Sequence, residues 1–381
     1  MKKSITVLFA AFIMYTSVQS ADSFAAEKPE ISARACVLIS ADTGEVVYSE
    51  NAAEKLPMAS TTKIMTTLLC LESGNLYEEF TVDSEAIKVE GSSMGLVEGD
   101  TVTKYALCCG MLLPSGNDAA NAVAVKLGGS IEHFAEIMNE RAEELGLSHT
   151  YFVTPSGLEG DGHGSSAYDM AILAREALKN EIFREICSSE TIETQFGDPP
   201  YRRWLKNTNR LLSMYDGVYG VKTGFTDEAG RCLVSACERD GVNLICVTLN
   251  DANDWQDHIA MYDYGFELLS CKTVELPKCF ETNAVGGEKD KLVLVPETDS
   301  IAVTLLSHNS SDVHFEPVLP PFVYAPTECG ETVAEVKVMF RNREICRIPL
   351  KSAESMPVKE ISRKEKNTFI GKILKALKKN K

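Results

Sequence analysis

The sequence predicts an α/β domain over residues 28–270, followed by a small all-β domain over residues 273–355. In the first region, strand-like segments stand at both ends and helical periodicity fills the middle, so one sheet is expected to gather strands from distant parts of the chain. In the second region, short runs rich in Val, Ile and Leu are separated by Gly, Asn, Asp and Pro, which is typical of short strands joined by turns. A length of 381 residues suits two such domains with extensions.

The chain opens with the pattern of a secretory signal peptide. Two lysines precede an apolar run and then small residues, in MKKSITVLFAAFIMYTSVQSADSFAAE. Cleavage after Ser20 or after Ala25 fits this pattern, and we interpret residues 1–25 as the signal peptide. The apolar run is short for a membrane span. An uncleaved N-terminal anchor is the alternative, and either interpretation predicts an exported protein.

The elements of the α/β region follow in a definite order. ACVLIS (35–40) predicts a strand, and DTGE (42–45) predicts a turn. Helical periodicity then appears in four segments, over residues 60–72, 118–127, 131–145 and 167–179, the third with a stop signal at Gly146. Residues 231–250 predict two strands joined at Asp240-Gly241, a hairpin signal, and residues 257–270 predict a closing helix.

The all-β region holds five strand-like runs. They are KLVLVP (291–296), SIAVTLL (300–306), VHFEPVL (313–319), TVAEVKVMF (332–340) and EICRIPL (344–350). This region shows no catalytic constellation, so we interpret it as a spacer or a partner-binding module.

Residues 359–381 form a basic amphipathic segment. They hold nine Lys or Arg and two Asp or Glu, which gives a net charge of +7. Because the whole chain has a net charge of −17, the other 358 residues have a net charge of −24. At 100° per residue, one side of a helix over 369–381 would be apolar and the opposite side would carry lysines. Such a helix suits an anionic membrane surface, and a solvated or self-packing helix is the alternative. The acidic remainder argues against nucleic-acid binding.

Twelve cysteines are a high number for an exported protein. Several lie in apolar runs and none forms a CxxC pair with zinc spacing, so we interpret most as free core thiols. Disulfides among Cys271, Cys279, Cys329 and Cys346 are left open. The six histidines, His163 among them, show no metal-binding spacing, and neither a P-loop nor a GxGxxG motif occurs. We therefore expect no metal and no cofactor.

The segment PMASTTKIMTTLLCLE (57–72) places Ser60 and Lys63 on one predicted helical turn, where positions i and i+3 face the same way. A helix start is partially positive and favours acidic residues, so a lysine there is unusual. It makes sense if the amine must be neutral, because the helix dipole, burial and a second cation all lower the pKa of a lysine. A neutral lysine can take the proton of a serine and activate it as a nucleophile. A capping Ser60 with a solvated Lys63 is the alternative.

Two further motifs offer partners for this pair. LLPSGNDAA carries Ser115 and Asn117 on a Pro/Gly loop before a helix, which can aim the serine hydroxyl into a cleft. VKTGF carries Lys222, Thr223 and Gly224 on a predicted edge strand, where the lysine offers a cation for a carboxylate and the glycine lets a substrate backbone approach. Taken singly, the first motif is also an ordinary cap and turn, and the second an ordinary strand end.

In the order SxxK, SxN, KTG, the three motifs are far more specific together than alone. With them the sequence resembles the low-molecular-weight penicillin-binding proteins, the serine-type D-alanyl-D-alanine carboxypeptidases of peptidase family S11. The likeness extends over most of the chain and includes TGEVVYSEN, TPSGL, HGSSAYDMAILAREAL, NTNRLL and VKTGFTDEAGRCLVSA. It implies a β-lactamase/transpeptidase-like fold for residues 28–270. One departure is Thr154, where such enzymes often carry Asn before Pro-x-Gly-Leu.

The resemblance also implies roles for single residues. Ser60 would attack the carbonyl between two terminal D-alanines of a peptidoglycan stem peptide, Lys63 would act as the general base, and Ser115 would relay a proton. The substrate would be held by Asn117, Lys222, Thr223 and Gly224, with the backbone N–H groups of Ser60 and Phe225 forming the oxyanion hole. β-Lactam antibiotics would acylate the same serine. The expected location is the extracytoplasmic face of the bacterial cytoplasmic membrane, with peripheral attachment through residues 369–381.

Three other interpretations share these residues. A β-lactamase uses the same trio, although no convincing equivalent of the extra class A glutamate is evident. An endopeptidase that cuts peptidoglycan cross-links would use the same machinery. A catalytically silent wall-binding protein is the third, and the intact motifs argue against it.

Overall fold

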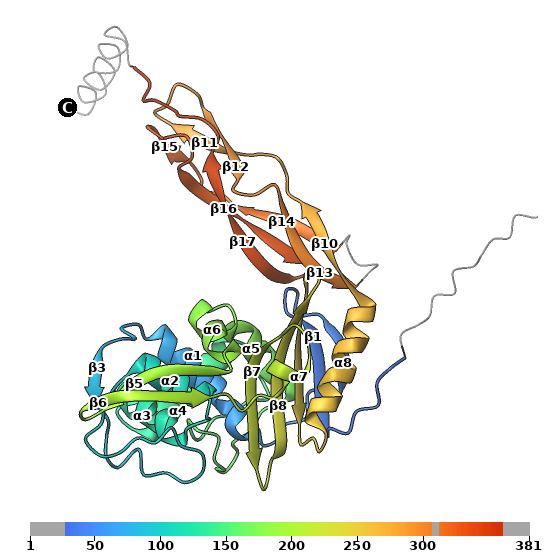
Figure 1. Cartoon of the computed structure of the whole chain (residues 1–381). Coiled ribbons are helices and arrows are strands. Elements are labelled where there is room, and N and C mark those ends of the chain that lie inside the picture. The colour runs from blue at the N-terminus through green and yellow to red at the C-terminus, as the bar shows by residue number, and fades with distance from the viewer. Residues whose placement is uncertain (1–26, 307–311, 361–381) are drawn as a thin grey trace, which may run out of the picture.

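The computed structural model describes residues 27–306 and 312–360, and Figure 1 shows their arrangement. A sheet with helices packed against it forms the lower part of the view, and an elongated β-rich part extends away from it. The predicted signal peptide (1–25) and residues 361–381 of the predicted basic segment lie outside the described residues. None of the described helices is long and apolar enough to cross a membrane.

One antiparallel sheet organises the first part. Its strand order is β2-β1-β9-β8-β7, with β1 at Ala35–Ser40, β2 at Val46–Glu50, β7 at Val218–Thr226, β8 at Gly230–Arg239 and β9 at Val242–Leu249. Strands from both ends of the region meet in it, since β1 pairs with β9 from Ala35↔Leu249 to Ser40↔Leu244. The predicted strand at 35–40, the hairpin at Asp240-Gly241 and the edge position of the KTG segment are confirmed.

The sheet separates two hydrophobic cores. Alternate residues of β1 belong to different cores: Val37 and Ile39 pack in the core formed with the helices between β2 and β7, and Cys36 and Leu38 pack on the side of the helix α8 at Asp254–Leu268. A strand that is buried on both faces has no reason to alternate polar and apolar residues. This explains the continuous apolar run ACVLIS.

The four helical segments predicted between the strands are confirmed, with small shifts of their ends. They correspond to a 3₁₀ turn at Ala59–Thr62 followed by α1 at Lys63–Glu72, then α3 at Asn117–Gly128, α4 at Ile131–Glu144 and α5 at Ala167–Ala177. The predicted closing helix is α8 at Asp254–Leu268, which begins three residues earlier than expected.

Several elements were not predicted. They are the strand β2, the helices α2 at Lys104–Leu112, α6 at Glu181–Ser188 and α7 at Leu211–Met214, and a four-stranded sheet of β3 at Glu79–Thr81, β4 at Thr101–Thr103, β5 at Thr191–Gly197 and β6 at Pro200–Lys206.

The β-rich part contains all five predicted strands. They are β12 at Lys291–Pro296, β13 at Ser300–Leu306, β14 at Val313–Val318, β16 at Thr332–Phe340 and β17 at Arg343–Ser352. Three unpredicted strands join them, namely β10 at Leu269–Glu275, β11 at Phe280–Val285 and β15 at Val323–Tyr324. A six-stranded sheet in the order β14-β16-β17-β12-β11-β15 and a β10-β13 pair result.

The two parts touch through specific hydrogen bonds. Thr304 in β13 donates its backbone N–H to Asp42 Oδ2 (2.7 Å), and the Arg343 guanidinium donates to the carbonyl of Gly44 (2.6 Å). Both acceptors lie in the turn after β1, which the sequence predicted at residues 42–45. This turn therefore serves as the docking point of the β-rich part.

All twelve cysteines are free thiols, and eight of them are buried. The prediction of core thiols is therefore confirmed for most of them. Cys279 and Cys329 are exposed, and none of the four cysteines for which disulfides were left open is paired.

Candidate active site

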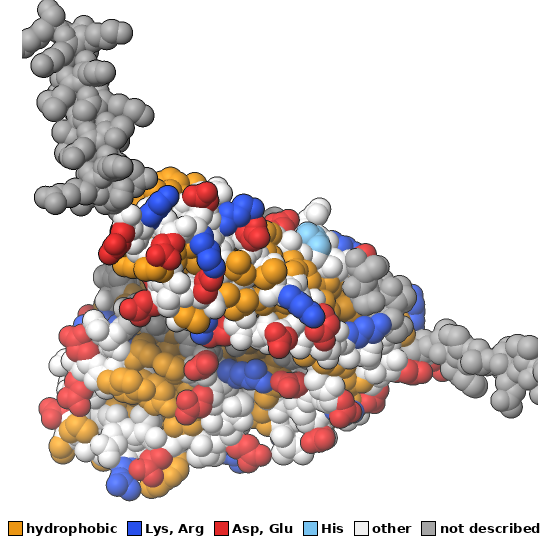
Figure 2. All heavy atoms as spheres, turned by 90° about the horizontal axis from the view of Figure 1, so that it is seen from above, with side chains coloured by type: hydrophobic (Ala, Val, Ile, Leu, Met, Phe, Trp, Pro, Cys, Tyr) orange, Lys and Arg blue, Asp and Glu red, His pale blue; other side chains and the backbone are white. Residues whose placement is uncertain are grey.

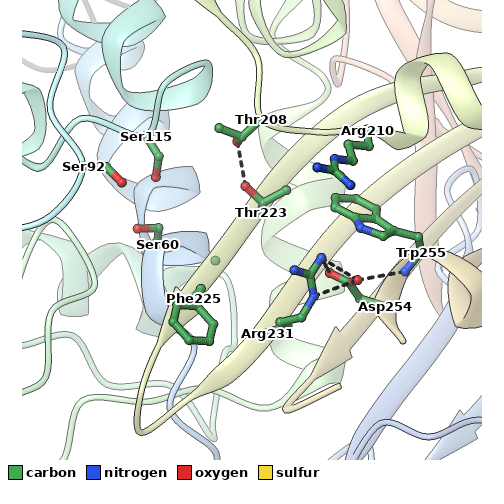
Figure 3. A pocket seen from close by; sticks show the side chains of 11 residues that line it. Ser60, Ser92, Ser115, Thr208, Arg210, Thr223, Phe225, Arg231, Asp254 and Trp255 are labelled. Atoms are coloured by element: carbon green, nitrogen blue, oxygen red, sulfur yellow. Dashed lines mark hydrogen bonds and ion pairs between the residues drawn. The ribbon is translucent and has the colours of Figure 1, made fainter. Parts of the chain in front are cut away.

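The three sequence motifs meet at one cleft of about 360 Å³ between the helices and the edge strand β7. Figure 3 shows Ser60 from the 3₁₀ turn, Ser115 from the loop before α3 and Thr223 from β7 around this cleft. Residues separated by more than 160 positions are thus brought together by the pairing of β7 with the sheet.

The turn that carries Ser60 is held in an unusual conformation. Ala59 has φ +46°, in the left-handed region that costs free energy for a residue with a Cβ. Gly157, with φ +88°, packs against the Ala59 carbonyl so closely that a Cβ at this glycine would lie 1.9 Å from the oxygen. Thr62 Oγ1 donates to the same carbonyl (2.8 Å). The TPSGL segment therefore clamps the turn from behind.

His163 also supports this turn, through the hydroxyl of Thr62. Its Nδ1 accepts the backbone N–H of Val153 (3.0 Å), so Nε2 carries the proton and donates to Thr62 Oγ1 (3.0 Å). Burial lowers the pKa of His163 to about 4, and the ring is neutral at physiological pH. His163 is thus a positioning residue, in line with the structural role expected of the histidines.

Lys63 lies fully buried at the start of α1, and its Nζ has three neighbours. They are Ser60 Oγ at 2.8 Å, Asn117 Oδ1 at 2.7 Å and the Ser156 carbonyl at 2.6 Å. Burial lowers the pKa of Lys63 well below its usual value, and the charge of Lys222 lowers it further. Both causes were expected from the sequence, and burial is the larger one.

These neighbours decide where the lone pair of a neutral Lys63 points. A neutral amine has two N–H bonds and one lone pair. The Ser156 carbonyl can only accept, and Asn117 presents its oxygen because its Nδ2 donates to the Glu90 carbonyl (2.7 Å). Both N–H bonds are therefore used, and the lone pair faces Ser60, the one neighbour with a proton to give.

The loop that presents Ser115 is also strained and braced. Ser115 has φ +67°, and the next residue donates its N–H to the Gly110 carbonyl (2.8 Å). Asp118, buried in the first turn of α3, accepts the backbone N–H groups of Met94 (2.9 Å) and Leu96 (3.0 Å). Sequence reasoning missed Asp118, although an acidic residue in the first helical turn is a recognisable signal.

Two of the predicted residues on β7 are Lys222, which is buried, and Gly224, which lines the cleft. Lys222 is buried and donates from Nζ to the Thr223 carbonyl (2.8 Å), and burial lowers its pKa to about 7. A Cβ at Gly224 would lie 3.1 Å from the backbone nitrogen of Ser60. The glycine therefore lets the Ser60 turn approach β7, while the next side chain, Phe225, is 63% exposed at the cleft.

Asn117 is placed differently from the expectation. Its amide is held between Lys63 and Glu90 rather than turned toward the cleft, so its contacts orient the general-base candidate. The hydroxyl of Thr223 meets that of Thr208 at 2.8 Å, beside the cleft.

Four charged or aromatic residues at the cleft were not picked out from the sequence. Arg231 forms a two-pronged ion pair with Asp254 (2.7 and 2.8 Å) and lies 5.3 Å from the Trp255 ring. Arg210 is exposed and makes no ion pair within residues 27–306 and 312–360. NTNRLL, which carries Arg210, was among the matched segments, but a lone arginine gives no signal of its own. No cluster of three or more His, Cys, Asp or Glu side chains that could hold a metal occurs in the same ranges.

Comparison with known proteins places this cleft in a family. The family model for D-alanyl-D-alanine carboxypeptidases, peptidase S11, matches residues 22–253. The chain belongs to the peptidase S11 family. It is accordingly a serine peptidase with D-alanyl-D-alanine carboxypeptidase activity, and a penicillin-binding enzyme of the cell wall.

Relatives in this family match along most of the chain. The D-alanyl-D-alanine carboxypeptidase DacF of Bacillus subtilis is 32% identical and covers 93% of this chain and 95% of its own. Penicillin-binding protein 5 of Haemophilus influenzae has a similar structure, with a TM-score of 0.63, 25% identity, and coverage of 87% of this chain and 99% of its own. The Streptomyces K15 DD-transpeptidase, with a TM-score of 0.61 and 32% identity, covers 64% of this chain and all of its own. The β-lactamase/transpeptidase-like fold is thereby confirmed.

The effect of the Lys222 charge on the pKa of Lys63 leads to a prediction about pH dependence. Replacing Lys222 by Met removes a positive charge that disfavours the protonated form of Lys63, so the pKa of Lys63 should rise. If Lys63 is the general base, acylation by a β-lactam requires its neutral form and declines as the pH falls through that pKa. The acid limb of the acylation rate should therefore move to higher pH in Lys222→Met.

Stopped-flow acylation between pH 4 and 9 measures this shift, with the exposed-lysine variant Lys179→Met as the control. A limb that stays in place, or moves to lower pH, would show that the Lys222 charge does not act on the base.

Proposed function

We propose that Ser60, Lys63 and Ser115 carry out the removal of the terminal D-alanine from peptidoglycan stem peptides. The observation that carries the assignment is the environment of Lys63 Nζ, which lies 2.8 Å from Ser60 Oγ with its other two neighbours restricted to accepting. This amine is the base that a serine nucleophile needs, because a hydroxyl reacts slowly unless its proton is taken.

The first half-reaction then runs as a balanced acyl transfer. Ser60 Oγ bonds to the carbonyl carbon while its proton passes to Lys63, and the carbonyl oxygen gains the negative charge. The backbone N–H groups of Ser60 and Phe225 would hold this oxyanion, and one such donor is typically worth roughly 3–4 kcal/mol. Ser115 passes the proton to the leaving nitrogen, the C–N bond breaks, and D-alanine departs. Water then hydrolyses the acyl-enzyme.

We assign the terminal carboxylate to Thr223 and Arg210, with Lys222 as a cation behind them. Lys222 is buried and bonded to the Thr223 carbonyl, whereas Arg210 lies exposed on the cleft. A planar guanidinium also matches a carboxylate with two parallel hydrogen bonds.

We further propose that the protein is exported through residues 1–25 and acts on the outer side of the cytoplasmic membrane. Residues 369–381 would attach it to anionic headgroups, because their sequence sets an apolar stripe against lysines. Residues 28–270 would form the catalytic domain, and residues 273–355 would hold it away from the membrane as a spacer.

The nucleophile is tested with a pentapeptide that ends in D-Ala-D-Ala. The Ser60→Ala variant should release D-alanine at least about a thousandfold more slowly than the parent, because the acyl-enzyme cannot form. It should also no longer be labelled by a fluorescent penicillin. The exposed Ser213→Ala variant is the matched control and should behave as the parent.

Other outcomes separate the alternative activities. Release of D-alanine that persists in Ser60→Ala would overturn the assignment. Rapid turnover of penicillin would indicate a β-lactamase, and cleavage restricted to cross-linked dimers would indicate an endopeptidase.

The carboxylate assignment is tested with Arg210→Gln. A charge-assisted hydrogen bond is worth about 1.5–3 kcal/mol, so KM should rise roughly tenfold to a hundredfold with a smaller change in kcat. A substrate whose terminal carboxylate is amidated should bind the parent and the variant alike. Arg202→Gln, an exposed arginine on β6, is the control, and an equal loss on the amidated substrate would contradict the assignment.

A further inference from the structure

The far end of the β-rich part exposes four apolar side chains, here called the distal patch. They are Val285, Phe322, Tyr324 and Val358, with exposed fractions of 45%, 45%, 68% and 53%. A single exposed apolar residue is ordinary on a protein surface, but a group of them that includes two aromatic rings calls for an explanation.

The members of the distal patch are neighbours in the structure. Val285 at the end of β11 pairs directly with Tyr324 in β15. The rings of Phe322 and Tyr324 meet edge to face, with centroids 5.2 Å apart. Val358 lies beside them, since its backbone bridges to Gly287, two residues beyond Val285.

The distal patch lies where the chain leaves the fold. Figure 1 shows β11 and β15 at the end of the β-rich part that is farthest from the catalytic sheet. Lys359, the first residue of the basic segment 359–381, donates its backbone N–H to the Gly286 carbonyl (2.8 Å) and so lies directly beside the patch. Figure 2 shows hydrophobic side chains reaching the surface of this part among acidic and basic ones.

We propose that the distal patch is a second membrane contact that dips into the lipid interface beside the basic segment. The inference rests on the peripheral membrane location proposed above and names a surface that shares in it. Tyr and other aromatic side chains favour the headgroup region, because their rings are apolar and the Tyr hydroxyl stays hydrated. The strength of interfacial binding scales with the apolar area that is buried, so an apolar contact beside the basic segment would strengthen attachment.

Charge and area both favour a membrane over a protein as the occupant. Near the patch, Lys289 is paired with Glu354 and Lys291 with Glu281, whereas the exposed Glu288 and Asp290 form no ion pair within residues 27–306 and 312–360. The net charge of +7 on residues 359–381 is more than these two carboxylates could neutralise if the segment folded back onto the patch, whereas anionic headgroups supply counter-ions for all of it. Four side chains also offer a smaller contact area than the roughly 800 Å² that each partner buries in a stable dimer.

Because the β-rich part is hydrogen-bonded to the catalytic part, a membrane contact at the distal patch would also position the catalytic cleft. Arg343 also donates to the Tyr168 hydroxyl (2.9 Å), in addition to its bond with the carbonyl of Gly44. Two contacts with the membrane at one end and a hydrogen-bonded joint at the other would hold the cleft at a set height above the lipid. A single flexible attachment would leave that height undefined.

The test uses the full chain and vesicles that contain phosphatidylglycerol. The Tyr324→Trp variant places an indole in the distal patch, and brominated lipid quenches an indole only when the ring enters the bilayer interface. The parent has tryptophans at Trp204 and Trp255 only, so its fluorescence is the baseline. Tyr77→Trp, at a tyrosine that is 70% exposed on the catalytic part, is the matched control. We expect quenching of the Tyr324→Trp signal and none beyond the baseline for Tyr77→Trp.

A second variant measures the strength of the contact. Phe322→Ser combined with Tyr324→Ser should weaken vesicle binding roughly fivefold to tenfold, with unchanged release of D-alanine from a soluble pentapeptide. Binding without quenching would mean that the basic segment acts alone and would overturn the patch proposal while leaving peripheral attachment intact. A parent that does not bind vesicles would overturn both. A change in monomer–dimer equilibrium in the double variant would instead make the patch a contact between copies.

Discussion

The proposed mechanism depends on keeping the buried amine of Lys63 uncharged and directed at the hydroxyl of Ser60. Burying Lys63 as a cation would be costly, and the structure offers it no carboxylate partner among its three hydrogen-bonding neighbours. Neutral, it has two protons and two groups that only accept, so its lone pair is left for Ser60. The strain at Ala59 and Ser115, the clamp by Gly157 and the bracing by His163 are all consistent with the need to hold this arrangement before substrate arrives.

The arrangement of the sheet also helps to position the turn that carries Ser60. The two-sided burial of β1 fixes the sheet, and the sheet places its edge strand β7 against the turn that carries Ser60. Gly224 permits this close approach, since any side chain there would press on the Ser60 backbone. The cleft is therefore formed where a strand with an unpaired edge faces a helix start, and an extended peptide can lie along that edge.

Much of this could be predicted from the sequence, for reasons that are local. The Asp240-Gly241 hairpin, the apolar run of β1 and the helix stop at Gly146 each carry their own signal, and three short motifs in one order indicated the site. What was missed depends on tertiary contacts. Helix α2 is apolar around its whole circumference because it is buried, so it lacks helical periodicity. The role of Asn117 as a partner of Lys63, the bracing by Asp118 and the exposure of Arg210 at the cleft follow only from which side chains the fold brings together.

The central claim is that Lys63 is neutral at physiological pH in the free enzyme. The most direct measurement is an NMR titration of the lysine Cε resonances in protein labelled at lysine, with the Lys63 signal assigned by its loss in Lys63→Arg. We expect the Lys63 signal to titrate well below the usual range of a lysine, because burial and Lys222 both lower its pKa, and to have the chemical shift of a neutral amine at pH 7, as a base for Ser60 requires. A signal that stays that of an ammonium group up to pH 10 would contradict the account, since Ser60 would then have no base.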